Sequence, residues 1–214
     1  SNDYYAVEYS PSGEFIVTGS EDGFVRIWNA STWTNLRSFN ANTAVTTVDY
    51  SGDGMYIAAG LNNDSLAILY SNNLSLVYDV SSVDVGGNDL VNSVEFSPDS
   101  SKVAVAIGRE NGNQGTNGEV AIYDVQTGAE LYTLNPNSED RFFDTAFSPD
   151  GQYIALAGNG DIYIVNTTSG STTWTFTNPP AAVNAVAWSP DGNYISMCGG
   201  WEGQSASFDM YQYG

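Results

Sequence analysis

One phrase occurs five times in this chain. It begins with an aromatic residue, continues with Ser-Pro-Asp-Gly or a close variant, and ends in a short apolar run. The intervals between the aromatic residues are 41, 46, 51 and 41 positions, and these residues are Tyr9, Tyr50, Phe96, Phe147 and Trp188. A period in this range indicates an array of similar supersecondary units, each of which buries its faces against its neighbours.

Each unit divides into short runs that predict four strands. The runs are rich in Val, Ile, Tyr, Phe and Trp and are separated by turn residues, and no segment of helical length has a 3.6-residue period. In the Ser-Pro-Asp-Gly turn, Pro sets φ, Asp bonds the nearby backbone and Gly accepts the strained last position. We therefore predict an all-β fold, a five-bladed β-propeller with four-stranded antiparallel blades. It forms one domain over residues 1–214, with blades at about 1–43, 44–88, 89–139, 140–180 and 181–214.

The first unit carries a family signature. Residues 19–32, GSEDGFVRIWNAST, resemble the WD repeat, with Trp28-Asn29 at the dipeptide that names it. Tyr123-Asp124 and Val165-Asn166 hold that place in later units, and the resemblance covers essentially the whole chain. It implies a toroidal β-propeller that acts as a rigid, non-catalytic platform for protein partners.

The chain departs from the family in one respect. The family often has a His that bonds an Asp in the turn before the third strand, but this chain contains no His. We expect the aspartates at that position to bond backbone N–H groups instead; they are Asp22, Asp64 and Asp161.

The last unit is expected to lack its outer strand, because only Gln212, Tyr213 and Gly214 follow its third strand. An unpaired edge is a template for strand addition. Two interpretations stay open. The edge accepts a strand from another copy and so builds a filament, or the sequence represents an incomplete chain.

Candidate chemistry is sparse. Without His the chain lacks the usual general base and the commonest metal ligand, and Cys198 in an apolar strand is predicted to be buried and inert. Glu8, Asp49 and Glu95 occupy one position in three successive first strands. They would form an acidic ring for Ca²⁺ or a glycosidase pair, or they pack between blades near a solvated rim. Because Ala fills that position in the last two units, we predict no catalytic residues, no cofactor and no metal site.

Charge restricts the partners. The formal net charge is -20, with 5 Lys and Arg against 25 Asp and Glu, which repels nucleic acid and anionic lipid. No apolar run reaches the roughly 20 residues of a membrane span, so we expect neither a nucleic-acid partner nor membrane insertion. The start Ser-Asn-Asp predicts a processed product or part of a longer chain. Together with the low Lys content it favours an extracellular or cell-surface location, with the cytoplasm as the alternative that the family implies.

Two functions remain open: a scaffold for protein–protein interaction, and an extracellular structural protein that self-assembles through its open edge. The partner is thus another protein or a copy of the chain, with N-glycans expected at the sequons Asn29, Asn63, Asn73 and Asn166. Exposed Trp, the long loop 109–119 and the open edge supply the predicted contact residues. These are Trp33, Trp174, Trp201, Asn113, Ser207, Asp209 and Tyr211.

Overall fold

The structure is a computed structural model. It describes residues 3–80, 90–108, 118–134, 136, 141–158, 160–177, 182–200 and 207–213. Within these ranges all regular secondary structure is β-strand, so the prediction of an all-β fold is confirmed. A search of these residues finds no helical segment with the length and hydrophobicity of a membrane span.

The described strands form antiparallel sheets in which neighbours in sequence are neighbours in space. Four sheets have four strands, β1 to β4, β5 to β8, β9 to β12 and β13 to β16, and one has three, β17 to β19. The bounds are β1 Tyr4–Tyr9, β2 Phe15–Ser20, β3 Phe24–Asn29, β4 Asn35–Asn40, β5 Val45–Tyr50, β6 Tyr56–Leu61, β7 Ser65–Tyr70, β8 Leu76–Val80, β9 Leu90–Phe96, β10 Lys102–Gly108, β11 Glu119–Asp124, β12 Glu130–Leu134, β13 Phe142–Phe147, β14 Tyr153–Gly158, β15 Asp161–Asn166, β16 Thr172–Thr177, β17 Val183–Trp188, β18 Tyr194–Gly199 and β19 Ser207–Gln212.

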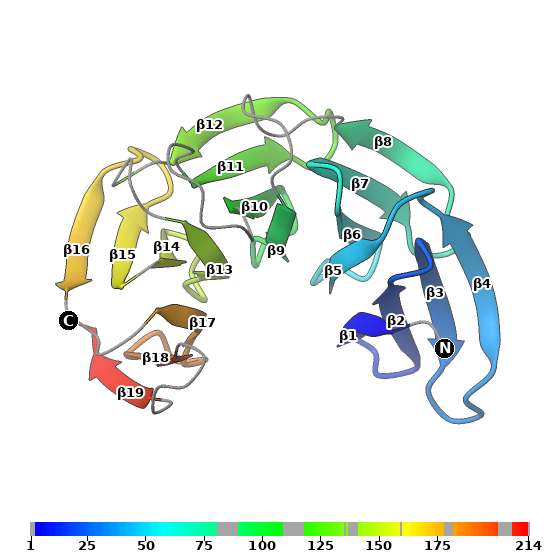
Figure 1. The fold of residues 1–214 in the computed structure, drawn as a ribbon, viewed down its shortest axis with the longest axis horizontal. Coiled ribbons are helices and arrows are strands. Elements are labelled where there is room, and N and C mark those ends of the chain that lie inside the picture. The colour runs from blue at the N-terminus through cyan, green and yellow to red at the C-terminus, as the bar shows by residue number, and fades with distance from the viewer. Residues whose placement is uncertain are drawn as a thin grey trace.

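The sheets stand side by side along an arc, like blades (Figure 1). The first strand of each sheet lies on the inside of the arc, and β4, β8, β12 and β16 lie on the outside. Each sheet packs against the next one along the chain. The first sheet and the β17–β19 sheet stand at opposite ends of the arc. These residues therefore do not close the ring that the family resemblance implies.

The repeated turn is built as its residues predict. In the fourth unit Ser148 Oγ donates to Asp150 Oδ1 at 2.6 Å and accepts the Tyr153 N–H at 2.9 Å. The Gly151 N–H donates to the Ser148 carbonyl at 2.8 Å, with Gly151 at a φ of +69°. The third unit has Ser100 at the equivalent position, with a φ of +59°.

Replacing Gly151 by alanine is expected to lower the free energy of unfolding by about 1–2 kcal/mol, the cost of a left-handed conformation for an L-residue. The added methyl would meet nothing closer than Pro98 Cδ at 3.7 Å, so backbone strain accounts for the effect. Chemical denaturation of the variant measures it, with the exposed neighbour change Gln152→Ala as control. An equal loss in both variants would contradict this account of the turn.

Between neighbouring sheets lie four hydrophobic clusters. In each cluster, the face of one sheet that points toward the next sheet along the chain (its forward face) packs against the face of the next sheet that points back toward it (its backward face). In one of them Ile122 of β11 packs with Leu156 of β14. Both of these side chains are fully buried. Burial of one such side chain stabilises the fold by about 1.5–3 kcal/mol. The seams between sheets, rather than a single central core, therefore hold the array together.

Candidate interaction surface

Two carboxylates on the inside of the arc bind the backbone of the next sheet. Asp49 at the end of β5 accepts the Phe96 N–H of β9 through Oδ2 at 2.7 Å. Glu95 on β9 accepts the Phe147 N–H of β13 through Oε2 at 2.9 Å. Because the repeat places each acid one residue before an aromatic, each one reaches the same backbone group one sheet further along. These acids connect sheets across the seams.

Asp144 on β13 connects three sheets. Its Oδ2 accepts the Val186 N–H of β17 at 3.0 Å, and its Oδ1 accepts the Ser93 hydroxyl of β9 at 2.9 Å. Asp144 lies outside the repeated acidic position, so the repeat did not single it out.

Burial dominates the electrostatics of these acids. Removal from water raises the pKa of Asp49 to about 6, although hydrogen bonds from the Phe96 and Tyr50 N–H groups oppose the shift. Burial, followed by the negative charges of Asp49 and Asp144, raises the pKa of Glu95 well above its usual range. Burial likewise raises the pKa of Asp144.

The three acids of the predicted ring are not equivalent in the structure. Glu8 is exposed, whereas Asp49 and Glu95 are taken up by bonds to the neighbouring backbone. The packing interpretation is therefore correct for Asp49 and Glu95, which are half-buried and bond the backbone of the next sheet. Among the described residues, no group of three or more Asp, Glu or Cys side chains could hold a metal ion.

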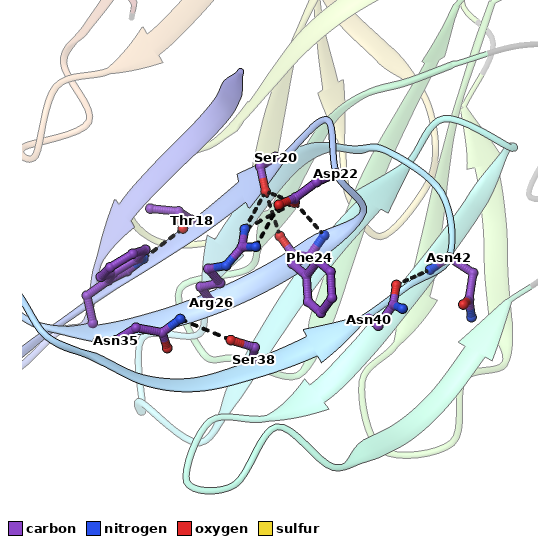
Figure 2. Close-up of polar contacts among 10 residues, drawn as sticks. Thr18, Ser20, Asp22, Phe24, Arg26, Asn35, Ser38, Asn40 and Asn42 are labelled. Atoms are coloured by element: carbon purple, nitrogen blue, oxygen red, sulfur yellow. Dashed lines mark hydrogen bonds and ion pairs between the residues drawn. The ribbon is translucent and has the colours of Figure 1, made fainter. Parts of the chain in front are cut away.

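A second polar cluster lies in the first sheet, around the turn between β2 and β3 (Figure 2). Arg26 pairs with Asp22, with 2.6 Å between Nη2 and Oδ2, and Arg26 Nη1 also donates to Ser20 Oγ at 2.9 Å. Asp22 Oδ1 accepts the Phe24 N–H at 3.2 Å, which confirms for Asp22 the expected bond to the backbone. The hydrogen bonds that Arg26 donates to the Asp22 carboxylate raise the pKa of Arg26. An arginine from the third strand thus provides Asp22 with a cationic partner.

The change Asp22→Ala is expected to lower the free energy of unfolding by about 1–3 kcal/mol, because it removes a charged acceptor from Arg26 and from the Phe24 N–H. Both charged side chains are only 16% exposed, so water replaces the lost bonds poorly. Thermal or urea unfolding measures the loss. The exposed Asn35→Ala, which removes a bond to Ser38 in the same sheet (Figure 2), is expected to cost less than about 0.5 kcal/mol. Similar losses in both variants would contradict a special role for Asp22.

The structure brings two of the predicted contact residues, Trp174 and Tyr211, into one aromatic cluster. Trp174 on β16 stacks on Phe176, with ring centroids 5.2 Å apart, and Phe176 packs on Tyr211 of β19 at 4.6 Å. Trp174 remains 42% exposed. Trp33 lies in the turn between β3 and β4 and is 70% exposed, at the other end of the arc. The outer side of the fourth and fifth sheets therefore presents an aromatic surface, and Trp33 is separate from it.

The remaining predicted contacts concern β19. Asp209 is half-buried on this strand, and β19 is the last strand of its sheet in the described part of the chain, with β18 as its neighbour. Ser207 begins the strand, but its side chain is outside the described residues. Asn113 and Trp201 also lie outside the described residues, as does most of the loop 109–119.

The prediction of a buried Cys198 is wrong: the thiol is exposed. Cys198 pairs with Phe208 across the β18–β19 ladder, and no sheet among the described residues covers this face. A shallow groove lies here, lined by Ala185, Ala187, Cys198 and Phe208 among others. Sequence reasoning also missed Phe208 and Met210, which are 72% and 64% exposed. On β19 they occupy the same register positions as the buried Ile162 and Ile164 on β15, and this correspondence is the signal that could have identified them.

The comparisons with known proteins agree with this architecture. Residues 1–29 and 33–71 match the family described as WD domain, G-beta repeat. Residues 70–213, about two thirds of the chain, match the family described as Eukaryotic translation initiation factor eIF2A. The chain is a WD-repeat protein. Because the second match covers more than half of the chain, the chain belongs to the family described as Eukaryotic translation initiation factor eIF2A.

Individual relatives are also translation initiation factors. The chain is 29% identical over 163 residues to Eukaryotic translation initiation factor 3 subunit I of Coccidioides immitis, a match that covers 72% of this chain and 47% of the relative. The same subunit of Aspergillus terreus is 28% identical over 162 residues, covering 72% and 46%. The chain spans about half the length of the curated relatives it matches.

These relatives correct the expected location. They are subunits of a translation initiation factor, and translation initiation takes place in the cytoplasm. The preference for an extracellular or cell-surface protein is therefore wrong. The extracellular filament and the N-glycans at Asn29, Asn63, Asn73 and Asn166 gain no support from the comparisons.

Proposed function

We propose that this chain is a non-catalytic scaffold that binds other proteins as part of a translation initiation factor. The similarity to subunit I of initiation factor 3 carries the proposal, since a subunit holds its place through contacts with other subunits. The fold is suited to this role, because rigid sheets hold the exposed turns and outer strands in fixed positions.

The proposed unit is a single WD-type domain with blades at about residues 1–43, 44–88, 89–139, 140–180 and 181–214. This division is supported by the sheets, one of which falls in each range, and by the clusters that join each sheet to the next. The three-stranded β17–β19 sheet supports a last blade without an outer strand of its own.

For the binding surface we propose the exposed aromatics Trp33 and Trp174, with Tyr211 in the aromatic cluster around Trp174 and Asp209 two residues before Tyr211 on β19. Trp is enriched among residues that dominate binding energies, and Trp174 is held in place by its stacking on Phe176. A pre-positioned aromatic side chain loses little conformational entropy on binding.

The test is to express the tagged chain in Aspergillus fumigatus, one of the fungi with a matching relative, and to probe the purified material with antibodies against initiation factor 3 subunits. We expect these subunits to co-purify. The double variant Trp33→Ala, Trp174→Ala is expected to lose at least tenfold of the recovered subunits, whereas Met55→Ala, which removes a 54% exposed side chain elsewhere, is expected to leave recovery unchanged. Absence of initiation factor subunits from the wild-type eluate would refute the role in translation, and equal recovery with the double variant would refute the surface.

The partners are proposed to be proteins and not RNA. The net charge of -20 opposes binding to a phosphate backbone. In an electrophoretic mobility assay with a labelled single-stranded RNA at low salt, where electrostatic attraction is strongest, we expect no shifted band. A salt-sensitive complex at micromolar protein would contradict this expectation.

A further inference from the structure

One position on the outer strand of the four-stranded sheets differs in chemistry between the first sheet and the others. This residue lies in the ladder opposite an isoleucine of the third strand, and the isoleucines are Ile27, Ile68, Ile122 and Ile164. The residues opposite them are Arg37, Tyr78, Tyr132 and Trp174. Three sheets thus have an aromatic side chain at this position, and the first sheet has an arginine.

In the second and third sheets the tyrosine at this position bridges the seam. The Tyr78 hydroxyl donates to the Asp124 carbonyl of the third sheet at 3.1 Å, and the Tyr132 hydroxyl donates to the Thr167 carbonyl beside the fourth sheet. The ring of Tyr78 lies against Gly128, where an added methyl carbon would meet a ring atom at 2.8 Å. The glycine in the turn of the third sheet therefore makes room for the tyrosine ring.

The seam between the first and second sheets is built differently. Leu74 follows β7 at the position that Gly128 has after β11, because the two N–H groups close equivalent turns, to the carbonyls of Tyr70 and Asp124. Leu74 is only 4% exposed and belongs to the hydrophobic cluster of this seam, so a side chain occupies the turn position that accommodates a tyrosine ring in the next seam. A groove of about 430 Å³, with Arg37 in its wall, remains open between the first two sheets.

The groove combines an unpaired base with hydroxyl groups and an apolar wall. Its lining includes Arg37, Phe15 and Ile27 from the first sheet and Tyr50 and Ser71 from the second. In the part of the chain that the structure describes, the Arg37 guanidinium makes neither an ion pair nor a hydrogen bond. Burial raises the pKa of Tyr50, whereas a hydrogen bond with Ser71 and the positive charge of Arg37 oppose the shift. The phenol, the serine hydroxyl and the guanidinium therefore lie close together.

We propose that this groove binds the carboxylate side chain of a Glu or Asp in a segment of a protein partner. The fork of donors on a guanidinium matches the two oxygens of a carboxylate. The groove is larger than a carboxylate group needs, and Phe15 and Ile27 offer apolar contact to the neighbouring residues of the segment. This inference rests on the proposed role as a protein-binding scaffold and specifies the chemistry of one contact.

Charge favours a carboxylate over a phosphate in this groove. Asp53 also lines it, and the net charge of the chain is -20. A doubly charged phosphate is repelled by these negative charges about twice as strongly as a singly charged carboxylate at the same place. Arg37 supplies one positive charge, which a single carboxylate neutralises. We therefore expect the partner segment to present one acidic side chain without phosphorylation.

An array of pentapeptides with acetyl and amide ends tests this preference. The central residue is Glu, Asp, Gln, Asn or phosphoserine, and the flanking residues are varied. We expect the labelled 214-residue chain to bind the Glu and Asp series about fivefold more strongly than the Gln and Asn series, an effect between those of an exposed and a buried ion pair. Phosphoserine is expected to give no advantage over Gln.

Three variants assign the preference to the groove. Arg37→Gln is expected to abolish it, and Arg37→Lys to keep part of it, because Lys retains the charge but not the fork of donors. Lys102→Gln removes a positive charge from the third sheet and is expected to leave the preference unchanged. Circular dichroism checks that each variant is folded. Protection gives a second readout: the bound Glu peptides should slow the modification of Arg37 by phenylglyoxal several-fold, and that of Arg26, which is paired with Asp22, should not change.

Equal binding of the acidic and amide series would overturn the proposal, as would a preference that survives in Arg37→Gln or is lost equally in Lys102→Gln. Stronger binding of the phosphoserine series would refute the choice of carboxylate, and displacement of the Glu peptides by equimolar free acetate would refute the protein source. The array contains no initiation factor subunit. A preference for acidic peptides without co-purification of those subunits would therefore refute the role in translation and leave this site intact.

Discussion

Replacing Ile164 by alanine is expected to lower the free energy of unfolding by about 2–5 kcal/mol, as for other large-to-small changes in a packed core. Ile164 is fully buried on β15, in the cluster that joins the fourth sheet to β17 and β18. Removal of its outer carbons leaves a cavity between two sheets, and neither ladder can shift without losing its register. Chemical denaturation at neutral pH measures the change.

Met210→Ala is the matched control, because Met210 occupies the same register position one sheet later but is 64% exposed. In the 214-residue chain we expect it to change the stability by no more than about 0.5 kcal/mol. A cost comparable to that of Ile164→Ala in this chain would mean that the forward face of the last sheet is already covered.

The change Asp49→Asn is expected to remove part of the pH dependence of stability. The folded-state pKa of Asp49 is raised to about 6, so the folded chain holds this proton at pH values where the unfolded chain has released it. The wild type therefore loses stability as the pH rises from about 4 to about 6, by about 3 kcal/mol for this group. Asn does not titrate. The free energy of unfolding of the wild type minus that of the variant should fall by this amount between pH 4 and pH 7, measured by urea denaturation.

Asp191→Asn supplies a control with the opposite sign. Hydrogen bonds from Ser189 and Asn193 lower the pKa of Asp191 to about 2. The stability that this acid contributes is thus present above its unfolded pKa and is lost only as the pH falls toward 2. Between pH 4 and pH 7 the free energy of unfolding of Asp191→Asn should therefore change in parallel with that of the wild type. Parallel pH profiles for the wild type and Asp49→Asn would show that the seam around Asp49 is more hydrated than its burial indicates.

The interior of each blade was predictable, because it depends on short-range chemistry. The Ser-Pro-Asp-Gly turns and the alternating apolar runs predict the strands, and the structure has strands there. The bond from the Phe24 N–H to Asp22 was also expected from the missing His. The sequence pattern did not predict that Arg26 would pair with Asp22, because that contact depends on how two strands bring side chains together around a turn.

The apolar faces that form the seams were predictable from the sequence, but which of these faces another sheet covers was not. Cys198 lies in an apolar run, yet its thiol is exposed, since burial depends on the sheet beside it and not on its own strand. Glu95 shows the converse, because this charged residue is half-buried and bonded at the seam, where the next sheet offers it a backbone N–H. The sequence by itself determined the repeat, its strands and its turns, all of which are set within a few dozen residues. Only the tertiary structure decided which faces meet another sheet, because the hydrophobic and electrostatic energies of a side chain depend on what lies across the seam.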